Sequence, residues 1–299
     1  MFKPMLAGTL PMLPGNKEWD LRTVKFPVLL SPKLDGVRAM VQNGQVYGRS
    51  LKLIPSRSAQ EVFGREELNG LDGELVMGAP TDPSCFNKTV RAVCSEDGPV
   101  GAVFYVFDYF HEQANYRFRS KLAEESSSAP SCEHVVQSLV YNADGLYMVE
   151  NEYLEKGYEG VMLRSVEGRY KQGRSTLNEG ILLKLKRFAD DEAMIIGFVE
   201  GQHNTNEAQT NELGRTFRSS AKAGQVLAGT LGKLTVRDMK TNVEFSIGTG
   251  WNEKTGKDIW GNRPSYLGKI VKYQHQLIGA LNKPRIPSFK GMRDPVDIL

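Results

Sequence analysis

The pattern of apolar residues changes near residue 190, and this change constrains the fold more than any other feature. From Asp190 onward, short strand-like runs at 193–200, 232–237, 243–248 and 270–273 are separated by glycine-rich turns. Such spacing is typical of a small all-β barrel. Before residue 190, strand-like runs alternate with segments of helical spacing. A chain of 299 residues is long enough for two cores, so we predict an α+β domain at 1–189 and a β-barrel at 190–299.

Within the first domain, the strongest strand signal is Ala102–Phe110, which is rich in aromatic and β-branched residues. Helical spacing of apolar residues predicts helices at 58–68, 82–95, 118–125 and 143–156. The predicted barrel is interrupted at 201–229 by a polar stretch with few large apolar residues. A polar insert of this length predicts a mobile loop.

The composition indicates a soluble globular protein, with 40% apolar and 24% charged residues. No run approaches the roughly 18 apolar residues of a membrane span, and the first residues lack the apolar core of a signal peptide. The three cysteines show no metal-binding spacing and the four histidines are scattered, which argues against a zinc site. We therefore expect an intracellular location, either the cytoplasm or the interior of a host cell if the source is viral.

Lys33 stands between two strand-like runs, beside an Asp35-Gly36 turn and Arg38. A lysine becomes a nucleophile when burial or a neighbouring cation favours its neutral amine. Arg38 could have this effect, and it could also bind a phosphate through two hydrogen bonds. The same residues are equally compatible with a surface hairpin that has no chemical role.

Later strand-like runs carry further residues with chemical potential. Taken singly, each has an ordinary structural explanation, since a mid-strand glutamate or lysine usually faces solvent and a strand aromatic usually lies in the core. Together they would supply an amine nucleophile, carboxylates for a divalent metal and a ribose, cations for a triphosphate, and an aromatic face for a base. These residues are Lys33, Arg38, Arg49, Glu74, Phe107, Glu159, Lys184 and Lys186.

Four of these stretches resemble motifs of a known family. Lys33–Arg38 is similar to the KxDGxR signature of ATP-dependent DNA ligases and their mRNA-capping relatives. The later stretches Asp72–Glu74, Glu159–Met162 and Lys184–Lys186 resemble the family's later motifs, in the same order. Further similarity at 170–177, 180–186, 245–250 and 265–269 extends the resemblance over essentially the whole chain, to the minimal two-domain type of ligase.

The resemblance implies a nucleotidyltransferase domain of antiparallel sheets and helices at 1–189 and a C-terminal OB-fold β-barrel at 190–299. It implies that ATP, with Mg²⁺ or Mn²⁺, adenylylates Lys33, that AMP then passes to the 5′-phosphate of a nick, and that the 3′-hydroxyl attacks that phosphate. The implied partner is nicked duplex DNA, bound by a monomer that encircles it. The insert at 201–229 matches the position of a DNA-closing latch. A role in DNA repair, replication or recombination would follow.

The resemblance also implies a role for each candidate residue. Lys33 would be the nucleophile, and because no histidine lies nearby in the sequence, we attribute its neutral amine to surrounding cations and the metal. Arg38 would contact a phosphate of the nick or of AMP, and Arg49 and Glu74 would contact the ribose region. Phe107 and Met162 would lie against the two faces of adenine, Glu159 and Glu74 would coordinate the metal, and Lys184, Lys186 and Arg174 would bind the α-phosphate. Arg215, Arg218 and Lys222 would contact the DNA backbone, and Arg285 and Arg293 would contact the pyrophosphate. The sequence closes on Asp-Ile-Leu, whereas ligases often close on a basic residue.

Two alternatives stay open at this point. One is another member of the same superfamily, an mRNA guanylyltransferase or an RNA ligase, although the latch-like insert and the stretches around Arg174 and Phe245 favour DNA. The other is a non-catalytic nucleic-acid binder that uses the OB-fold and carries a vestigial first domain. A vestigial site has no reason to keep Lys33, both glutamates and both strand lysines together, which favours an enzyme.

Overall fold

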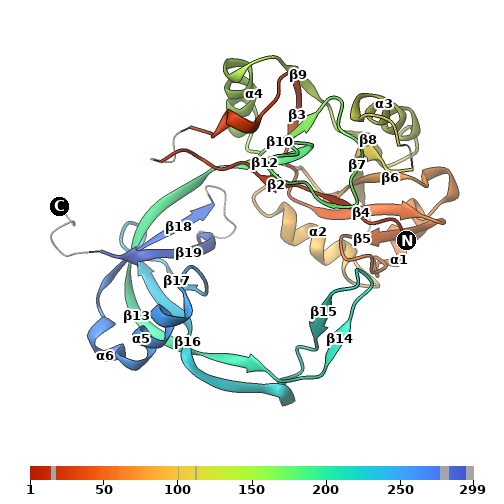
Figure 1. Cartoon of the computed structure of the whole chain (residues 1–299). Coiled ribbons are helices and arrows are strands. Elements are labelled where there is room, and N and C mark those ends of the chain that lie inside the picture. Colours follow the sequence, from red (N-terminus) through yellow and green to blue (C-terminus); the bar gives the residue numbers. More distant parts are fainter. Residues whose placement is uncertain (15–17, 100, 112, 277–282, 294–299) are drawn as a thin grey trace. The chain divides into compact units, whose positions relative to one another are not determined.

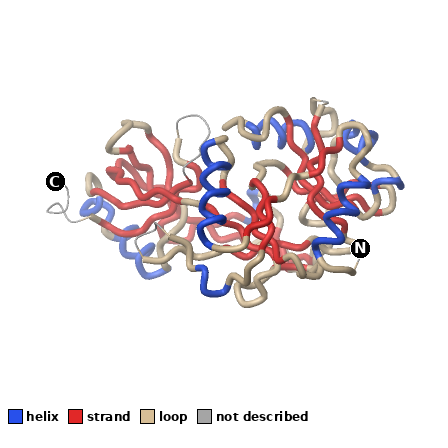
Figure 2. Tube along the Cα trace, turned by 90° about the horizontal axis from the view of Figure 1, so that it is seen from above, coloured by secondary structure: helices blue, strands red, loops and turns tan. Residues whose placement is uncertain are grey.

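The computed structural model describes residues 1–14, 18–99, 101–111, 113–276 and 283–293. It divides into two compact units, Met1–Lys186 and Arg187–Leu299 (Figure 1). In both units more residues lie in strands than in helices, and Figure 2 distinguishes the two by colour. The boundary lies slightly before the predicted one at 189 and 190, because strand β13 begins at Phe188 and pairs within the second unit.

The first unit contains two five-stranded sheets with the orders β5-β4-β6-β7-β8 and β2-β12-β10-β3-β9. Their pairing is antiparallel except between β7 and β8 and between β12 and β2, in agreement with the predicted antiparallel sheets. A short parallel pair, β1 with β11, stands apart. The strand bounds are β1 Met5–Leu6, β2 Gly8–Thr9, β3 Val28–Pro32, β4 Val37–Gln42, β5 Gln45–Gly48, β6 Leu71–Met77, β7 Ala102–Tyr109, β8 Cys132–His134, β9 Ser138–Val140, β10 Gly160–Ser165, β11 Gly173–Arg174 and β12 Leu182–Lys186.

Among the described residues of this unit, four α-helices cover the sheets: α1 (Arg57–Phe63), α2 (Cys85–Val93), α3 (Tyr116–Ser126) and α4 (Ala143–Glu155). The first three pack against the β5–β8 sheet and α4 packs against the other. Three of them start where a side-chain oxygen accepts a hydrogen bond from an amide of the first turn, at Ser56, Asn115 and Asn142. The predicted helix at 58–68 was wrong in length: it ends at Phe63 and is followed by a separate 3₁₀ turn. The 3₁₀ turns of this unit are Leu21–Thr23 and Glu66–Leu68.

The two sheets face each other across a small apolar cluster. Met40 of β4 and Leu182 of β12 meet there, with Met5 of the N-terminal strand and the rings of Phe110 and Tyr170. The outer sides of the sheets are buried against helices in two larger clusters. Strand side chains that point inward, away from the helices, therefore line the space between the sheets.

The second unit is a five-stranded antiparallel sheet in the order β17-β16-β13-β18-β19, wrapped around one apolar core. Its edges approach each other where the amide of Phe289 donates to the carbonyl of Thr249 (2.9 Å). In the described part of the chain, β17 and β19 form no continuous ladder, so the predicted barrel is partly open, as OB-folds are. The bounds are β13 Phe188–Asn204, β14 Ala208–Thr210, β15 Thr216–Arg218, β16 Gln225–Asp238, β17 Glu244–Ile247, β18 Ile270–Gln276 and β19 Arg285–Met292.

The expectation of an all-β second domain was wrong in one respect. Two helices, α5 (Glu253–Gly261) and α6 (Arg263–Tyr266), follow β17. The first starts after Asn252, whose side chain accepts from the amide of Thr255, and it buries Ile259 against the sheet. No described helix is long and apolar enough to cross a membrane.

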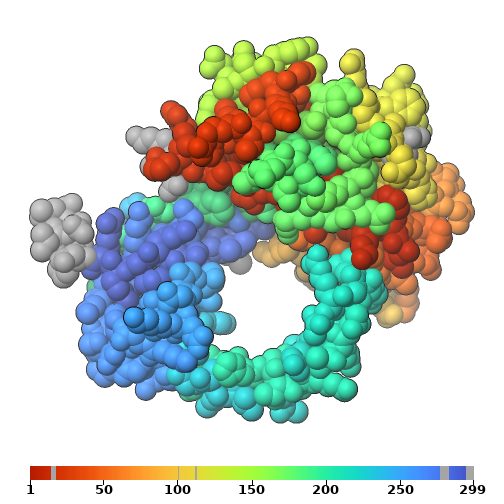
Figure 3. Space-filling view, viewed as in Figure 1, coloured from red at the N-terminus to blue at the C-terminus, as the bar shows by residue number. Residues whose placement is uncertain are grey.

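The insert at 201–229 is ordered by strands and is not the loop that its composition predicts. Strands β13 and β16 continue into it as far as the pair Asn204 and Gln225. Beyond that pair, β14 and β15 form a hairpin, and Lys222–Gly224 forms a 3₁₀ turn. We call residues 205–224 the arm; Figure 3 shows it in teal as a narrow extension from the rest of its unit.

Candidate active site

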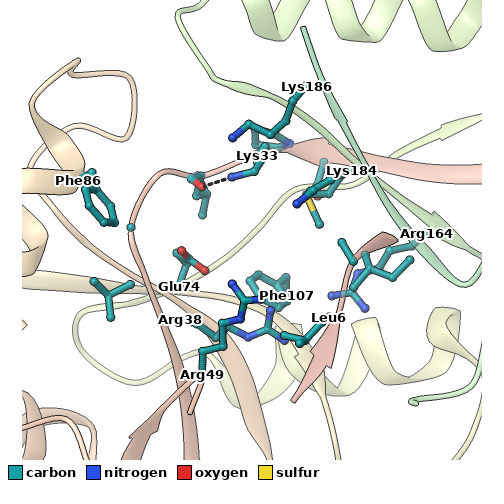
Figure 4. A pocket seen from close by; sticks show the side chains of 18 of the residues that line it. Leu6, Lys33, Arg38, Arg49, Glu74, Phe86, Phe107, Arg164, Lys184 and Lys186 are labelled. Atoms are coloured by element: carbon teal, nitrogen blue, oxygen red, sulfur yellow. Dashed lines mark hydrogen bonds between the residues drawn. The ribbon is translucent and has the colours of Figure 1, made fainter. Parts of the chain in front are cut away.

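A cavity of about 470 Å³ lies between the two sheets of the first unit. Cations dominate its charged lining, and most of the candidate residues from the sequence converge here. Figure 4 shows Lys33, Lys184 and Lys186 facing Glu74, Arg38 and Arg49 across the cavity. The sequence candidates that line it are Lys33, Arg38, Arg49, Glu74, Phe107, Met162, Arg174, Lys184 and Lys186.

Lys33 follows strand β3 directly, and its amide donates to the carbonyl of Gly160 (2.9 Å). Its Nζ lies 2.5 Å from Glu159 Oε2. The same Nζ donates to the Leu34 carbonyl at 3.4 Å (Figure 4). The turn after it depends on Gly36, because a Cβ there would lie 2.1 Å from the Leu75 carbonyl oxygen. This close approach lets strand β6 pass beside the lysine.

Glu159 precedes strand β10 and is almost fully buried, with 5% of its side chain exposed. It forms ion pairs with Lys33 and with Lys186, which faces it because Lys186 pairs with Gly160 in the β10–β12 ladder. Burial would raise the pKa of Glu159, but the two lysines outweigh it and lower that pKa below the ordinary value. Besides the surrounding cations, a buried carboxylate therefore contacts Lys33 directly.

Lys184 and Lys186 both line the cavity, as their two-residue spacing on a strand predicts. The pKa of the Lys184 ammonium is lowered, first by burial and then by the neighbouring charges of Lys186 and Lys33. Arg174 and Arg49 add to the same effect. Such a concentration of cations attracts anions, and phosphates in particular.

Arg38 is held on the opposite sheet by Asp72, to which Nε and Nη2 each donate at 2.6 Å. Its guanidinium lies 4.6 Å from the centroid of the Phe107 ring. In the same ladder Arg38 pairs with Glu74. Burial raises the pKa of Glu74 to about 7, although Arg38 and Lys33 oppose that rise. Glu74 therefore changes its charge near neutral pH.

The sequence missed one charged residue of the cavity. Arg164 lies in strand β10, donates to Asp108 Oδ2 at 2.6 Å, and stacks over the Tyr116 ring at 4.4 Å. Its guanidinium is also 5.2 Å from the Phe107 centroid. The available sequence signal was that Arg164 directly follows the apolar run Val161-Met162-Leu163, which indicates a buried arginine. A buried arginine requires a buried partner.

The other sequence candidates lie outside this cavity. Arg215, Arg218 and Lys222 belong to the arm, while Arg285 begins β19 and Arg293 follows it. Arg293 donates to Glu192 Oε1 at 2.6 Å. The final residues, 294–299, on which the closing motif partly depends, lie outside the described residues.

Carboxylates for a divalent metal are few in the cavity. Among the described residues, no group of three or more His, Cys, Asp or Glu side chains could hold a metal ion. Magnesium, however, is commonly bound by one or two carboxylates together with phosphates of the substrate. The buried, ionised Glu159 fits that kind of site.

Comparison with known proteins gives consistent matches over both units. A family model described as ATP dependent DNA ligase domain matches residues 4–186, and one described as DNA ligase OB-like domain matches residues 224–293. A DNA ligase of African swine fever virus is 26% identical over 227 residues, which are 68% of this chain and 51% of that protein. The chain spans between about a third and a half of the length of the curated viral relatives that it matches.

Solved structures match over nearly the full length. The structure of Chlorella virus DNA ligase-adenylate is 31% identical, with a TM-score of 0.53, and the match covers 98% of each chain. A structure of a Lig E DNA ligase shares the fold, with a TM-score of 0.72 and 23% identity over 98% of this chain and 100% of that one.

Proposed function

Because the chain belongs to the family of ATP-dependent DNA ligases, we propose that it seals nicks in duplex DNA through a covalent lysyl-AMP intermediate. The observation that carries this proposal is the position of Lys33, which projects into a cavity lined by the cations that a triphosphate requires. Group transfer between phosphates depends mainly on positioning and on charge neutralisation. The cavity is suited to both.

In the first step, Lys33 Nζ attacks the α-phosphorus of ATP. A P–N bond forms, the bond to the pyrophosphate oxygen breaks, and the amine gives up a proton to water. Lys184, Lys186 and Arg174 would bind the α-phosphate, because charge increases on its oxygens as the transition state forms. Arg285 and Arg293 are the candidates for contacting the pyrophosphate.

The nucleoside would be bound on the side of the cavity that carries Phe107. Its ring would stack on adenine, with Met162 against the other face. Arg49 and Glu74 would contact the ribose. Arg38, bound by Asp72, would contact a phosphate of AMP or of the nick.

A divalent metal, when bound with ATP, would neutralise phosphate charge. Glu159 is our first candidate for its carboxylate ligand, and Glu74 is the second. For Glu159 to take this role, its contacts with Lys33 and Lys186 would have to loosen. The same change would release the nucleophilic amine.

In the later steps, AMP would pass from Lys33 to the 5′-phosphate of the nick, and the 3′-hydroxyl would then displace AMP. We propose that the protein binds nicked duplex as a monomer and that the arm helps it to encircle the DNA. The exposed cations Arg215, Arg218 and Lys222 would contact the phosphate backbone.

The test is nick sealing with purified protein, ATP, Mg²⁺ and an end-labelled nicked duplex. Wild-type protein should seal the nick, and Lys33→Ala should not. Lys121→Ala, which removes an exposed lysine of helix α3, is the matched control and should seal normally. Sealing by Lys33→Ala at the wild-type rate, or covalent labelling from GTP but not from ATP, would contradict the proposal.

A further inference from the structure

The N-terminal strand forms one wall of the cavity, although it is bound to its own unit by few strand contacts. In the part of the chain that the structure describes, strand β1 pairs with the two residues of β11, and Leu6 and Ala7 line the cavity. Two site arginines bind the backbone of this segment. Arg38 Nη2 donates to the Met5 carbonyl at 3.2 Å, and Arg174 Nη1 donates to the Ala7 carbonyl at 2.6 Å.

Tyr170 forms hydrogen bonds both with this strand and with Asp72, the residue that binds Arg38. Its hydroxyl donates to Asp72 Oδ2 at 2.6 Å and accepts from the amide of Met5 at 3.0 Å. The residue is 7% exposed, and its ring packs in the apolar cluster between the sheets. Burial and the nearby Asp72 charge raise the pKa of Tyr170 well above its ordinary value, so the hydroxyl keeps its proton and remains a donor.

Asp72 is fully buried, and both of its oxygens already bind Arg38. A carboxylate held by one guanidinium alone can still turn together with that guanidinium as a pair. The third hydrogen bond, from Tyr170, comes from a side chain fixed in the core, and it removes that freedom. Tyr170 therefore fixes the orientation of Asp72, and Asp72 in turn fixes the orientation of Arg38.

We propose that Tyr170 is a positioning residue for lysine adenylylation: its single hydroxyl fixes the Arg38 guanidinium through Asp72 and holds the Met5–Ala7 wall in register with it. The inference rests on the proposed ligase function, since it takes Arg38 and this wall to contact the nucleotide. Tyr170 itself does not line the cavity among the described residues. It acts only through its two partners.

The experiment measures single-turnover transfer of labelled AMP to the protein at saturating ATP. Tyr170→Phe removes the hydroxyl and keeps the ring. Tyr147→Phe is the matched control, because the Tyr147 hydroxyl also accepts from a backbone amide of the N-terminal region, that of Trp19 (2.9 Å), but lies away from the cavity. Arg38→Lys and the double variant Arg38→Lys with Tyr170→Phe complete the set.

We expect Tyr170→Phe to lower the rate constant about tenfold, the effect of losing one hydrogen bond to a charged group. Tyr147→Phe should stay within about twofold of wild type. In the Arg38→Lys background, Tyr170→Phe should cause almost no further loss, because the group that it positions is already altered. A residue with a purely structural role would cause the same proportional loss in both backgrounds.

The assay is run at a temperature at which circular dichroism shows that wild type and the four variants are all folded. An unchanged rate for Tyr170→Phe, or an equal loss in both backgrounds, would overturn the inference. If wild type and Tyr147→Phe take up no AMP, the proposed function itself fails. That result is distinguishable, because it does not depend on Tyr170.

Discussion

Replacing Asp108 by Asn should destabilise the first unit strongly. Asp108 lies in β7 with its side chain fully buried, and it holds two buried arginines. Arg119 Nε donates to it at 2.8 Å and Arg164 Nη1 at 2.6 Å, and their side chains are 0% and 4% exposed. Asn keeps the shape of Asp but removes the charge that compensates both guanidinium groups.

Removing one partner of a buried ion pair costs about 3–5 kcal/mol, because a desolvated charge is left uncompensated. In a unit of this size each kcal/mol lowers the melting temperature by about 2–4 °C, so the total decrease should be about 6–20 °C. Asp97→Asn is the matched control, since Asp97 is 79% exposed and 3.4 Å from Arg57. An exposed pair of this kind contributes about 0.5 kcal/mol or less.

Thermal unfolding followed by circular dichroism at neutral pH measures both variants against wild type. We expect a clearly earlier transition for Asp108→Asn and an almost unchanged one for Asp97→Asn. If the two variants melt together with wild type, then Asp108 does not compensate the two arginines, and our account of how it holds Arg164 beside Phe107 is wrong.

Three further predictions concern pH, DNA binding and salt. Because burial raises the pKa of Glu74 to about 7 from its ordinary 4.5, the folded state binds this proton more tightly than the unfolded state. The free energy of unfolding should therefore fall by at most about 3 kcal/mol as pH rises from about 4.5 to 7, and then level off. Urea unfolding at pH 5 and pH 8 measures this fall, which Glu74→Gln should abolish. An equal pH dependence in wild type and Glu74→Gln would contradict the prediction. Replacing the arm, 205–224, by an Asn-Gly turn keeps the β13–β16 ladder intact up to Asn204 and Gln225. This replacement should weaken binding to nicked duplex more than it slows Lys33 adenylylation. Equal losses in binding and adenylylation would contradict the role of the arm as a DNA-closing latch. The same replacement should reduce the slope of log K against log salt by up to about three, since it removes three candidate phosphate contacts, and an unchanged slope would show that the arm does not contact phosphate.

Local patterns predicted most of the strands and much of the site. Strand β7 and helix α4 have almost the predicted bounds, because their sequence patterns agree with the packing that buries them. Lys184 and Lys186 share a face for the simple reason that strand side chains alternate. The motif order then predicted which distant strands meet around Lys33.

The supporting residues were not predictable in this way. Arg164, Asp108 and Tyr170 have roles that arise from contacts between strands and loops far apart in the sequence, and no local pattern records such pairs. Glu159 was predicted as a metal ligand, but its ion pairs with lysines depend on the register of β10 and β12.

The second unit shows where composition misleads. Helix α5 has two glycines among its nine residues, which weakens its helical signal, yet its cap and the burial of Ile259 stabilise it. The arm is polar and rich in Asn, Thr and Ser, as loops are, but its strands β14 and β15 pair as a hairpin. Packing and capping at α5, and strand pairing in the arm, overrode the local propensity.

Mass spectrometry of the protein after incubation with ATP and Mg²⁺ tests the central claim most directly. The account predicts an increase by the mass of one AMP, located on the peptide that contains Lys33, lost in Lys33→Ala and reversed by added pyrophosphate. AMP on a different residue, or an unchanged mass in protein that is folded and binds ATP, would contradict it.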